Sequence, residues 1–104
     1  RHPLEFYPGV SILIAAYNEA ACIKDTLVSI EQQQYLGELQ VIVINDGSQD
    51  DTANIVRNLQ QRFSWLTLLD LEKNAGKAHA LNEGLKLVQQ NLVVTVDADS
   101  QVRF

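Results

Sequence analysis

The sequence predicts an α/β fold of three layers, α/β/α, in which a mostly parallel sheet lies between helices. Four short apolar runs alternate along the chain with three stretches whose apolar residues recur at helical spacing. The runs lack the polar alternation of half-exposed strands, which is typical of strands buried on both faces of a parallel sheet. Since strand-helix-strand connections are right-handed, we expect strand order 3-2-1-4, one half of a doubly wound fold.

Composition and charge are ordinary for one folded domain and argue against nucleic acid as a partner. The chain has 104 residues, of which 46% are hydrophobic and 20% charged, and its net charge is −5. General nucleic-acid binding requires a basic face, so an anionic ligand must be held here by a cation or by local donors. The single cysteine, Cys22, excludes an internal disulfide. No apolar run reaches the ~18 residues of a membrane span, so we expect this fragment itself to be soluble.

An extended leader and a first strand-helix pair are predicted at the start of the sequence. Residues 1–9 contain Pro3 and Pro8, which favour an extended leader without a helix. Val10–Ala16 is the first apolar run, and Asn18 after it is a candidate cap for the next helix. That helix is predicted from apolar residues at helical spacing, which are Ile23, Leu27 and Ile30.

Two further strand-helix pairs are predicted in the middle of the sequence. Val41–Ile44 is an unbroken apolar strand, and Trp65–Leu71 is a third, weaker strand. The helix between them is predicted from the stripe Thr52, Ile55, Val56, Leu59 and Phe63. The helix after the third strand is predicted from Ala78, Leu81, Leu85 and Val88, and only Gly84 interrupts this stripe.

The last apolar run, Leu92–Val96, ends abruptly in Asp97 and Asp99. We expect this strand to be buried on both faces. Two carboxylates so close together repel each other, and a divalent cation that bridges them to a ligand's phosphates would neutralise them. A solvated turn is the alternative, because Asp is common where strands end.

Polar residues follow each of the four predicted strands. The clusters are Tyr17-Asn18-Glu19, Asp46-Gly47-Ser48, Asn74-Gly76-Lys77 and Asp97-Asp99. The amino ends of the same strands carry nothing comparable. Ligands of parallel α/β sheets bind beyond the carboxyl ends of the strands, so we expect the four clusters to meet at one edge and form a binding site.

The residue types at this edge favour a nucleotide diphosphate. Asp46 can accept a hydrogen bond from a base N–H or a ribose hydroxyl, and Gly47 allows a ligand close to the backbone. Lys77 begins a helix and can meet a phosphate with its charge and with the free N–H groups of that helix. A plain Asp-Gly turn and a solvated surface lysine are the alternatives. Neither a G-x-x-x-x-G-K-[ST] loop nor a G-x-G-x-x-G turn occurs, which argues against P-loop and dinucleotide sites.

The order of these motifs resembles that of the family 2 glycosyltransferases, which have the GT-A fold. The resemblance covers nearly the whole chain from Val10 onward. It is carried by Ile14-Ala15-Ala16-Tyr17-Asn18-Glu19, Val43-Ile44-Asn45-Asp46-Gly47-Ser48-Gln49-Asp50, Asn74-Ala75-Gly76-Lys77-Ala78-His79-Ala80-Leu81-Asn82 and Val96-Asp97-Ala98-Asp99-Ser100. Within the family, the residues of these motifs are most similar to those of processive membrane synthases of β-linked polysaccharides, such as poly-N-acetylglucosamine, cellulose and hyaluronan synthases. The resemblance implies the nucleotide-binding, Rossmann-like half of a GT-A domain.

The resemblance also implies a reaction and a role for each candidate residue. The reaction is inverting transfer of a sugar from a UDP-sugar donor to a hydroxyl of a glycan acceptor, with Mg²⁺ or Mn²⁺ as cofactor. The implied nucleotide-binding residues are Ala16, Tyr17, Glu19, Asp46, Lys77 and Asp97, and the implied metal ligands are Asp99 and Asp97. The parent protein is implied to act in polysaccharide synthesis at the cytoplasmic face of the cell membrane.

The sequence departs from the family pattern in one respect that bears on activity. The family's catalytic base is an acid in a later segment, and the synthases add a Q-x-x-R-W motif; neither occurs up to Phe104. An inverting transfer needs a base for the acceptor's proton. We therefore expect residues 10–104 to form an incomplete, nucleotide-sugar-binding half of a domain that does not turn over. We also expect an uncovered edge at Leu92–Val96 that pairs with another copy of the chain.

Two other functions are consistent with a small α/β sheet that carries acids at its carboxyl edge. One is a non-catalytic nucleotide-binding or interaction module, although such a module has no reason to keep Asp97 and Asp99. The other is a phosphoacceptor receiver domain. A receiver needs an acidic pair after its first strand and a lone Asp after its third, whereas the sequence has Tyr-Asn-Glu and Lys-Asn-Ala-Gly-Lys there.

Overall fold

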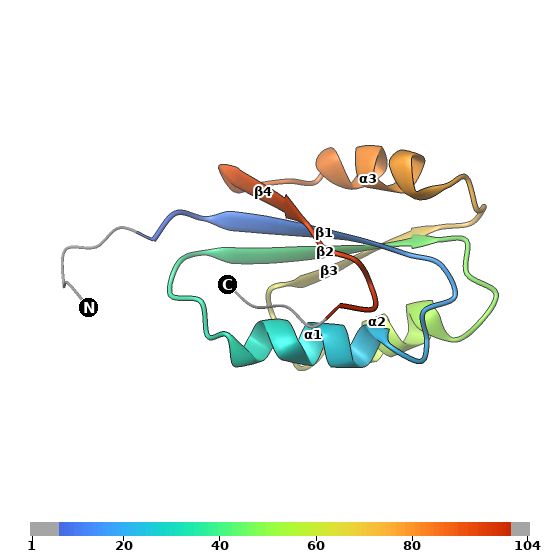
Figure 1. Cartoon of the computed structure of the whole chain (residues 1–104), viewed down its shortest axis with the longest axis horizontal. Coiled ribbons are helices and arrows are strands. Elements are labelled where there is room, and N and C mark those ends of the chain that lie inside the picture. The colour runs from blue at the N-terminus through green and yellow to red at the C-terminus, as the bar shows by residue number, and fades with distance from the viewer. Residues whose placement is uncertain (1–6, 101–104) are drawn as a thin grey trace.

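The computed structural model describes residues 7–100, so most of the predicted leader lies outside the described residues. Strands and helices alternate as predicted (Figure 1). The elements in chain order are β1 (Val10–Ala16), α1 (Ile23–Gln32), β2 (Leu39–Asp46), α2 (Thr52–Gln60), β3 (Leu66–Leu71), α3 (Lys77–Leu85) and β4 (Leu92–Thr95). No helix of the described part is long and apolar enough to cross a membrane.

The four strands form one parallel sheet in the order β3-β2-β1-β4, which confirms the predicted strand order. In β1, Val10 is paired with Leu39 of β2 on one side and with Leu92 of β4 on the other. A receiver domain has the order 2-1-3-4-5, in which the first strand lies beside the second and third. The neighbours of β1 therefore exclude the receiver alternative.

Helices cover both faces of the sheet and give the predicted three layers. Figure 1 shows α1 and α2 on one face and α3 on the other. Successive strand residues point to opposite faces, so Ile12 belongs to the core under α1 and α2, whereas Leu13 belongs to the core under α3. Both residues are buried. This two-sided burial explains why β1 and β2 read as unbroken apolar runs.

The predicted apolar stripes of α1 and α2 are the buried faces of these helices, but the predicted cap of α1 is wrong. The buried residues are Ile23, Thr26, Leu27 and Ile30 in α1, and Thr52, Val56 and Leu59 in α2, with Phe63 following α2. Ile55 of the predicted stripe is partly buried against the same core. Cys22, rather than Asn18, is the residue at the N-cap of α1. Asn18 has a φ of 53° and forms hydrogen bonds with the loop after β2 instead.

The predicted apolar stripe of α3 is only partly right. Leu81 and Val88 pack against the core under this helix, whereas Ala78 is exposed and Leu85 is 50% exposed. The fully buried residues of the helix are Ala80 and Gly84. A Cβ at Gly84 would lie 2.7 Å from Cδ1 of Ile44 in β2. The helix therefore approaches the sheet through its smallest residues, and the glycine that seemed to interrupt the stripe is part of the contact.

Strand β4 is exposed, contrary to the prediction that it is buried on both faces. Leu92, Val93 and Val94 are 48%, 42% and 42% exposed. The strand lies at the edge of the sheet, where it pairs with β1 alone among the described strands. Helix α3 lies over β1 and β2, and α2 lies over β2 and β3, so neither helix covers β4. An unbroken apolar run thus marks an uncovered edge strand in this chain.

Candidate nucleotide-sugar site

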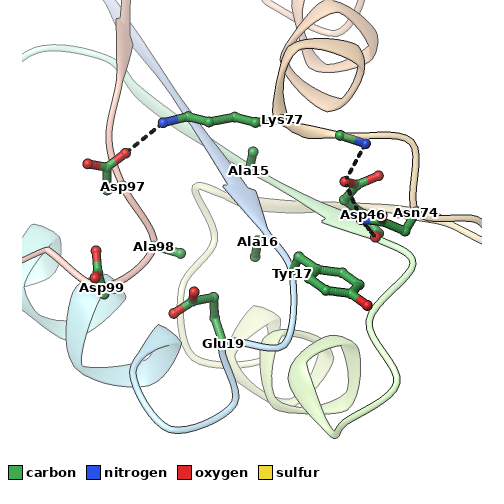
Figure 2. A pocket seen from close by; sticks show the side chains of 11 residues that line it. Ala15, Ala16, Tyr17, Glu19, Asp46, Asn74, Lys77, Asp97, Ala98 and Asp99 are labelled. Carbon is green, nitrogen blue, oxygen red and sulfur yellow. Dashed lines mark hydrogen bonds and ion pairs between the residues drawn. The ribbon is translucent and has the colours of Figure 1, made fainter.

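A pocket of about 440 Å³ lies at the carboxyl edge of the sheet, where the ends of β1, β2 and β4 meet the start of α3. Its lining residues are Ala15, Ala16, Tyr17, Glu19, Asp46, Asn74, Gly76, Lys77, Asp97, Ala98 and Asp99. All seven residues predicted for the site are among them. In Figure 2, Asp97 and Asp99 lie on one side of the pocket and Asp46 and Asn74 on the other.

Four hydrogen bonds fasten the loop after β1 to the loop after β2. The Asn18 N–H donates to Ser48 Oγ at 2.9 Å, and the Gln49 N–H donates back to Asn18 Oδ1 at 2.8 Å. The Glu19 N–H donates to Thr52 Oγ1 at 3.0 Å, and the Ala20 N–H donates to Asp50 Oδ2 at 3.1 Å. These bonds fix the backbone on either side of Tyr17 and Glu19, which line the pocket.

Asp50 joins this network to the first turn of α2. Its Oδ1 accepts the Thr52 N–H at 3.0 Å and also the Thr52 hydroxyl, while its Oδ2 accepts the bond from Ala20. The Thr52 hydroxyl is the main cause that holds the pKa of Asp50 below its usual range, and the backbone N–H groups of Thr52 and Ala20 add to it. The charged form of Asp50 is therefore the one that holds the two loops together.

Asp46 lies at the end of β2 and fastens the loop between β3 and α3. The residue is 3% exposed, and its carboxylate accepts hydrogen bonds from Asn74 Nδ2 at 2.8 Å and from the N–H groups of Ala75 and Gly76, both at 2.9 Å. A carboxylate has about four acceptor positions. One remains for a ligand after these three bonds, so the side chain predicted to meet a base or ribose also shapes the wall of the pocket.

Gly47 does not have the role that its position predicts. It has a φ of 70°, and a Cβ there would lie 2.3 Å from the backbone nitrogen of Asn74. The close approach that requires glycine is thus made by the β3–α3 loop rather than by a ligand. Gly76 also has a positive φ, 102°, and has no atom within 4 Å of its Cβ position. The backbone of Gly76, which lines the pocket, therefore leaves room for a ligand to approach closely.

Lys77 and Asp97 pair across the pocket. The Nζ of Lys77 lies 2.9 Å from Oδ1 of Asp97, and both side chains are 64% exposed. Figure 2 shows the lysine extending from the start of α3 toward the acid. An ion pair this exposed contributes only about 0–1 kcal/mol, so a phosphate or a metal ion can displace either partner at little cost.

The Asp97-Ala98-Asp99 segment is anchored by its middle residue. Ala98 is 5% exposed and packs into the core under α1, and its carbonyl oxygen accepts a 2.6 Å hydrogen bond from Thr26 Oγ1. The two acids on either side are exposed. Asp99 forms no hydrogen bond or ion pair with any described residue, so its carboxylate is available to a ligand.

The donor set limits how a metal could bind. Within residues 7–100, no group of three or more His, Cys, Asp or Glu side chains converges on one point. Asp97 and Asp99 offer hard oxygen ligands of the kind that Mg²⁺ prefers, and Mg²⁺ is commonly held by one or two carboxylates together with substrate phosphates and water. The two acids fit a metal that arrives with a diphosphate, and they do not form a complete protein cage.

Sequence reasoning missed two residues that build the pocket, Ala15 and Ala98. Asn74 and Gly76 also line it; they belong to the cluster expected at this edge after the third strand, although no individual role was predicted for them. Nothing in the sequence could have indicated Ala98, whose role depends on packing against α1.

Comparison with known proteins identifies the family. Residues 11–104 match the family described as Glycosyl transferase family 2. The chain is 43% identical over 94 residues to a poly-beta-1,6-N-acetyl-D-glucosamine synthase of Staphylococcus epidermidis, and 38% identical to one of Staphylococcus aureus. Each alignment covers 90% of this chain and 22% of the relative. The chain thus spans about a fifth of the length of these relatives.

Solved structures show the same fold. A mannosyltransferase from Pyrobaculum calidifontis, PcManGT, in complex with GDP-Man and Mn²⁺, is 36% identical with a TM-score of 0.85, over 90% of this chain and 28% of that one. S. aureus TarS in complex with UDP-GlcNAc is 30% identical with a TM-score of 0.80, over 86% of this chain and 26% of that one. The fold, the match over residues 11–104 and these relatives lead to one conclusion: the chain belongs to glycosyl transferase family 2 and has the GT-A architecture.

Proposed function

We propose that this chain carries the donor site of an inverting glycosyltransferase that uses a UDP-sugar and a divalent metal in polysaccharide synthesis. The observation that carries the proposal is the pocket itself, in which residues from four strand ends meet. One side offers buried Asp46 and half-exposed Tyr17. The other offers two exposed acids, toward which Lys77 reaches across the pocket from the start of α3. This division suits a ligand with a hydrogen-bonding base at one end and phosphates at the other.

The residues divide the work of binding according to this arrangement. The base and ribose lie against Ala16, Tyr17, Glu19 and the remaining acceptor position of Asp46. The diphosphate lies at the start of α3, where Gly76 leaves the backbone open and Lys77 supplies charge. The leaving diphosphate is also the group on which negative charge develops during transfer, so the same lysine and helix end favour the transition state.

Asp99 and Asp97 would hold Mg²⁺ or Mn²⁺ in this site. The metal would supply electrostatic stabilisation of the leaving diphosphate. The solved PcManGT complex contains Mn²⁺, which supports a metal in a related pocket. Lys77 then no longer needs to pair with Asp97 and is released toward the phosphates.

The relatives favour an N-acetylhexosaminyl donor. Two of them are described as poly-beta-1,6-N-acetyl-D-glucosamine synthases, and TarS was solved with UDP-GlcNAc. PcManGT was solved with GDP-Man, so a hexosyl donor is the competing assignment. We further propose that the acceptor is a glycan, that the parent protein acts at the cytoplasmic face of the cell membrane, and that residues 1–104 alone bind donor without turnover.

Calorimetric titration with UDP in Mn²⁺, and again with a chelator, tests the donor site. We expect binding in Mn²⁺ that weakens at least about tenfold with the chelator or in Asp99→Ala, the lower end of the loss expected for a metal-site substitution. Asp25→Ala removes an exposed carboxylate of α1 outside the pocket and is the matched control. A parallel titration with GDP tests whether the pocket prefers the nucleotide of UDP-GlcNAc or that of GDP-Man.

Three outcomes would contradict the proposal in different ways. UDP binding that is equal with metal and chelator removes the metal role of Asp99. A longer parent protein that keeps full transferase activity with Asp99→Ala would support the non-catalytic reading of this pocket. Sugar transfer by residues 1–104 alone would show that a catalytic base lies within this chain.

A further inference from the structure

A buried hydroxyl of α1 holds the Asp97-Ala98-Asp99 segment from beneath. Thr26 is 1% exposed and does not line the pocket, yet its Oγ1 lies 2.6 Å from the carbonyl oxygen of Ala98, 72 residues later in the sequence. This hydrogen bond is buried, as is Ala98 itself. The middle residue is thus fixed through its backbone and its side chain, while both neighbouring acids face solvent.

The other hydrogen bonds of this segment come from the backbone. The Val96 N–H donates to the Leu13 carbonyl at 3.0 Å, which extends the pairing of β4 with β1, and the Ser100 N–H donates to the Asp97 carbonyl at 3.1 Å. Nearly any sequence could form these two bonds. Among the described residues, Thr26 is the one side chain that bonds to the backbone between Val96 and Ser100.

We propose that Thr26 is a positioning residue, whose hydroxyl sets the direction of the Asp97 and Asp99 carboxylates for the metal-diphosphate part of a nucleotide-sugar. This inference rests on the proposed function and adds to it a residue that touches neither metal nor nucleotide. Thr26 acts only through the Ala98 carbonyl. Partners behind metal ligands commonly change metal affinity about 10–100-fold when removed.

Loss of the Thr26 hydroxyl would change the conformation of the Asp97-Ala98-Asp99 turn rather than that of helix α1. A buried carbonyl without a donor is unfavourable, so the Ala98 carbonyl would turn toward water and take the flanking acids with it. In α1, the Cys22 carbonyl, which the Thr26 hydroxyl also contacts at 3.3 Å, accepts the Thr26 N–H at 3.1 Å and keeps that bond when the hydroxyl is removed. The Ala98 carbonyl, by contrast, has no other donor among residues 7–100.

Two substitutions separate the hydroxyl from simple packing. Thr26→Val keeps the shape of the side chain and removes the donor. Thr26→Ser keeps the donor and removes the methyl group. A packing role is damaged more by serine, while a positioning role through the hydroxyl is damaged only by valine.

The test is a set of NMR titrations of this chain with UDP and with uridine, each in Mg²⁺ and in chelator. We expect Thr26→Val to weaken Mg²⁺-dependent UDP binding about 10–100-fold. Uridine lacks the diphosphate that would bring the metal to the two acids, so its affinity should be unchanged in the same variant. Thr26→Ser should bind both ligands as the unsubstituted chain does.

The outcomes distinguish this inference from the function on which it rests. If the unsubstituted chain shows no Mg²⁺-dependent UDP binding, the proposed function fails and this inference fails with it. If that binding exists but Thr26→Val retains it, or loses uridine and UDP equally, only this inference is overturned. Should the valine variant not fold, Thr26→Cys keeps a weak donor in a similar volume and should lose part of the Mg²⁺-dependent affinity. Unchanged affinity in that variant contradicts the proposal.

Discussion

Carboxylates at the carboxyl edge of the sheet have different functions according to the groups with which they form hydrogen bonds. Asp46 is buried and holds the β3–α3 loop through three hydrogen bonds. Asp50 holds the β1–α1 loop to α2. Asp97 and Asp99 are exposed and remain available for cations. At the scale of single residues, the same side chain therefore serves as an internal clamp or as a ligand, and its hydrogen-bond partners decide which.

The depressed pKa of Asp50 predicts a loss of stability in acid. The pKa of Asp50 is lower in the folded chain than in the unfolded chain. Asp50 therefore stabilises the fold fully at a pH above its pKa in the unfolded chain. This stabilisation is lost as the pH falls through its pKa in the folded chain. In Thr52→Val the largest cause of the shift is gone, so the pKa of Asp50 should rise toward its ordinary value. NMR detection of the Asp50 carboxyl carbon during an acid titration measures this pKa in the unsubstituted chain and in Thr52→Val.

Thr52→Ser is the matched control, because it keeps a hydroxyl at this position. The pKa of Asp50 should stay depressed in that variant. An Asp50 pKa that does not move in Thr52→Val would show that the backbone N–H groups, rather than the hydroxyl, carry the shift.

Small residues determine how α3 meets the sheet, and this contact belongs to the scale of the element. Ala80 and Gly84 lie one turn apart on the buried face of α3. Opposite them, the side chains of Leu13 and Ile44 in the sheet fill the space between helix and sheet. Gly76 at the N-cap of α3 and Lys77 in its first turn both line the pocket. The packing of α3 on the sheet therefore also positions these two residues.

Gly84→Ala should destabilise the chain although alanine is the better helix former. Alanine in place of glycine favours a helix by about 1 kcal/mol. The added Cβ would, however, meet buried Ile44 at 2.7 Å, and overpacking of this kind costs about 1–3 kcal/mol. We expect the free energy of unfolding in urea to fall by about 1 kcal/mol.

Asn82→Ala is the matched control, because Asn82 is exposed on the same helix. It should leave the unfolding free energy unchanged or raise it slightly, since alanine is the better helix former. If Gly84→Ala raised stability as well, the contact between α3 and the sheet would be looser than the distances indicate.

At the scale of the whole molecule, the sheet has one apolar edge that nothing described here covers. Strand β4 exposes Leu92, Val93 and Val94, and Leu85 and Leu87 are exposed nearby in sequence. An edge strand with apolar side chains and unpaired backbone groups readily pairs with another strand. We propose that two copies of this chain associate through β4.

Sedimentation velocity over a range of concentrations tests this association. We expect the unsubstituted chain to shift toward a dimer as its concentration rises, and Val93→Lys to remain a monomer, because charged side chains on an edge strand oppose pairing. Lys24, exposed on α1, provides a control substitution to Ala away from the edge. A clean monomer at every concentration would falsify the proposal.

The pattern of the sequence was enough to predict the sheet, the helix order and the edge at which the site residues meet. Unbroken apolar runs indicate parallel strands, and such strands present their carboxyl ends at one edge. The pattern therefore predicts that Tyr17, Asp46, Lys77 and Asp97 lie together, and all four line one pocket.

Tertiary structure alone decided what each residue contacts. The exposure of β4, the burial of Gly84 on α3, the hydrogen bond that Asp46 accepts from the β3–α3 loop and the one that Thr26 donates to Ala98 all depend on parts of the chain that are far apart in sequence. Local patterns report the period and polarity of a segment. They carry no information on which neighbour covers it, because that neighbour is supplied by the packing of the whole chain.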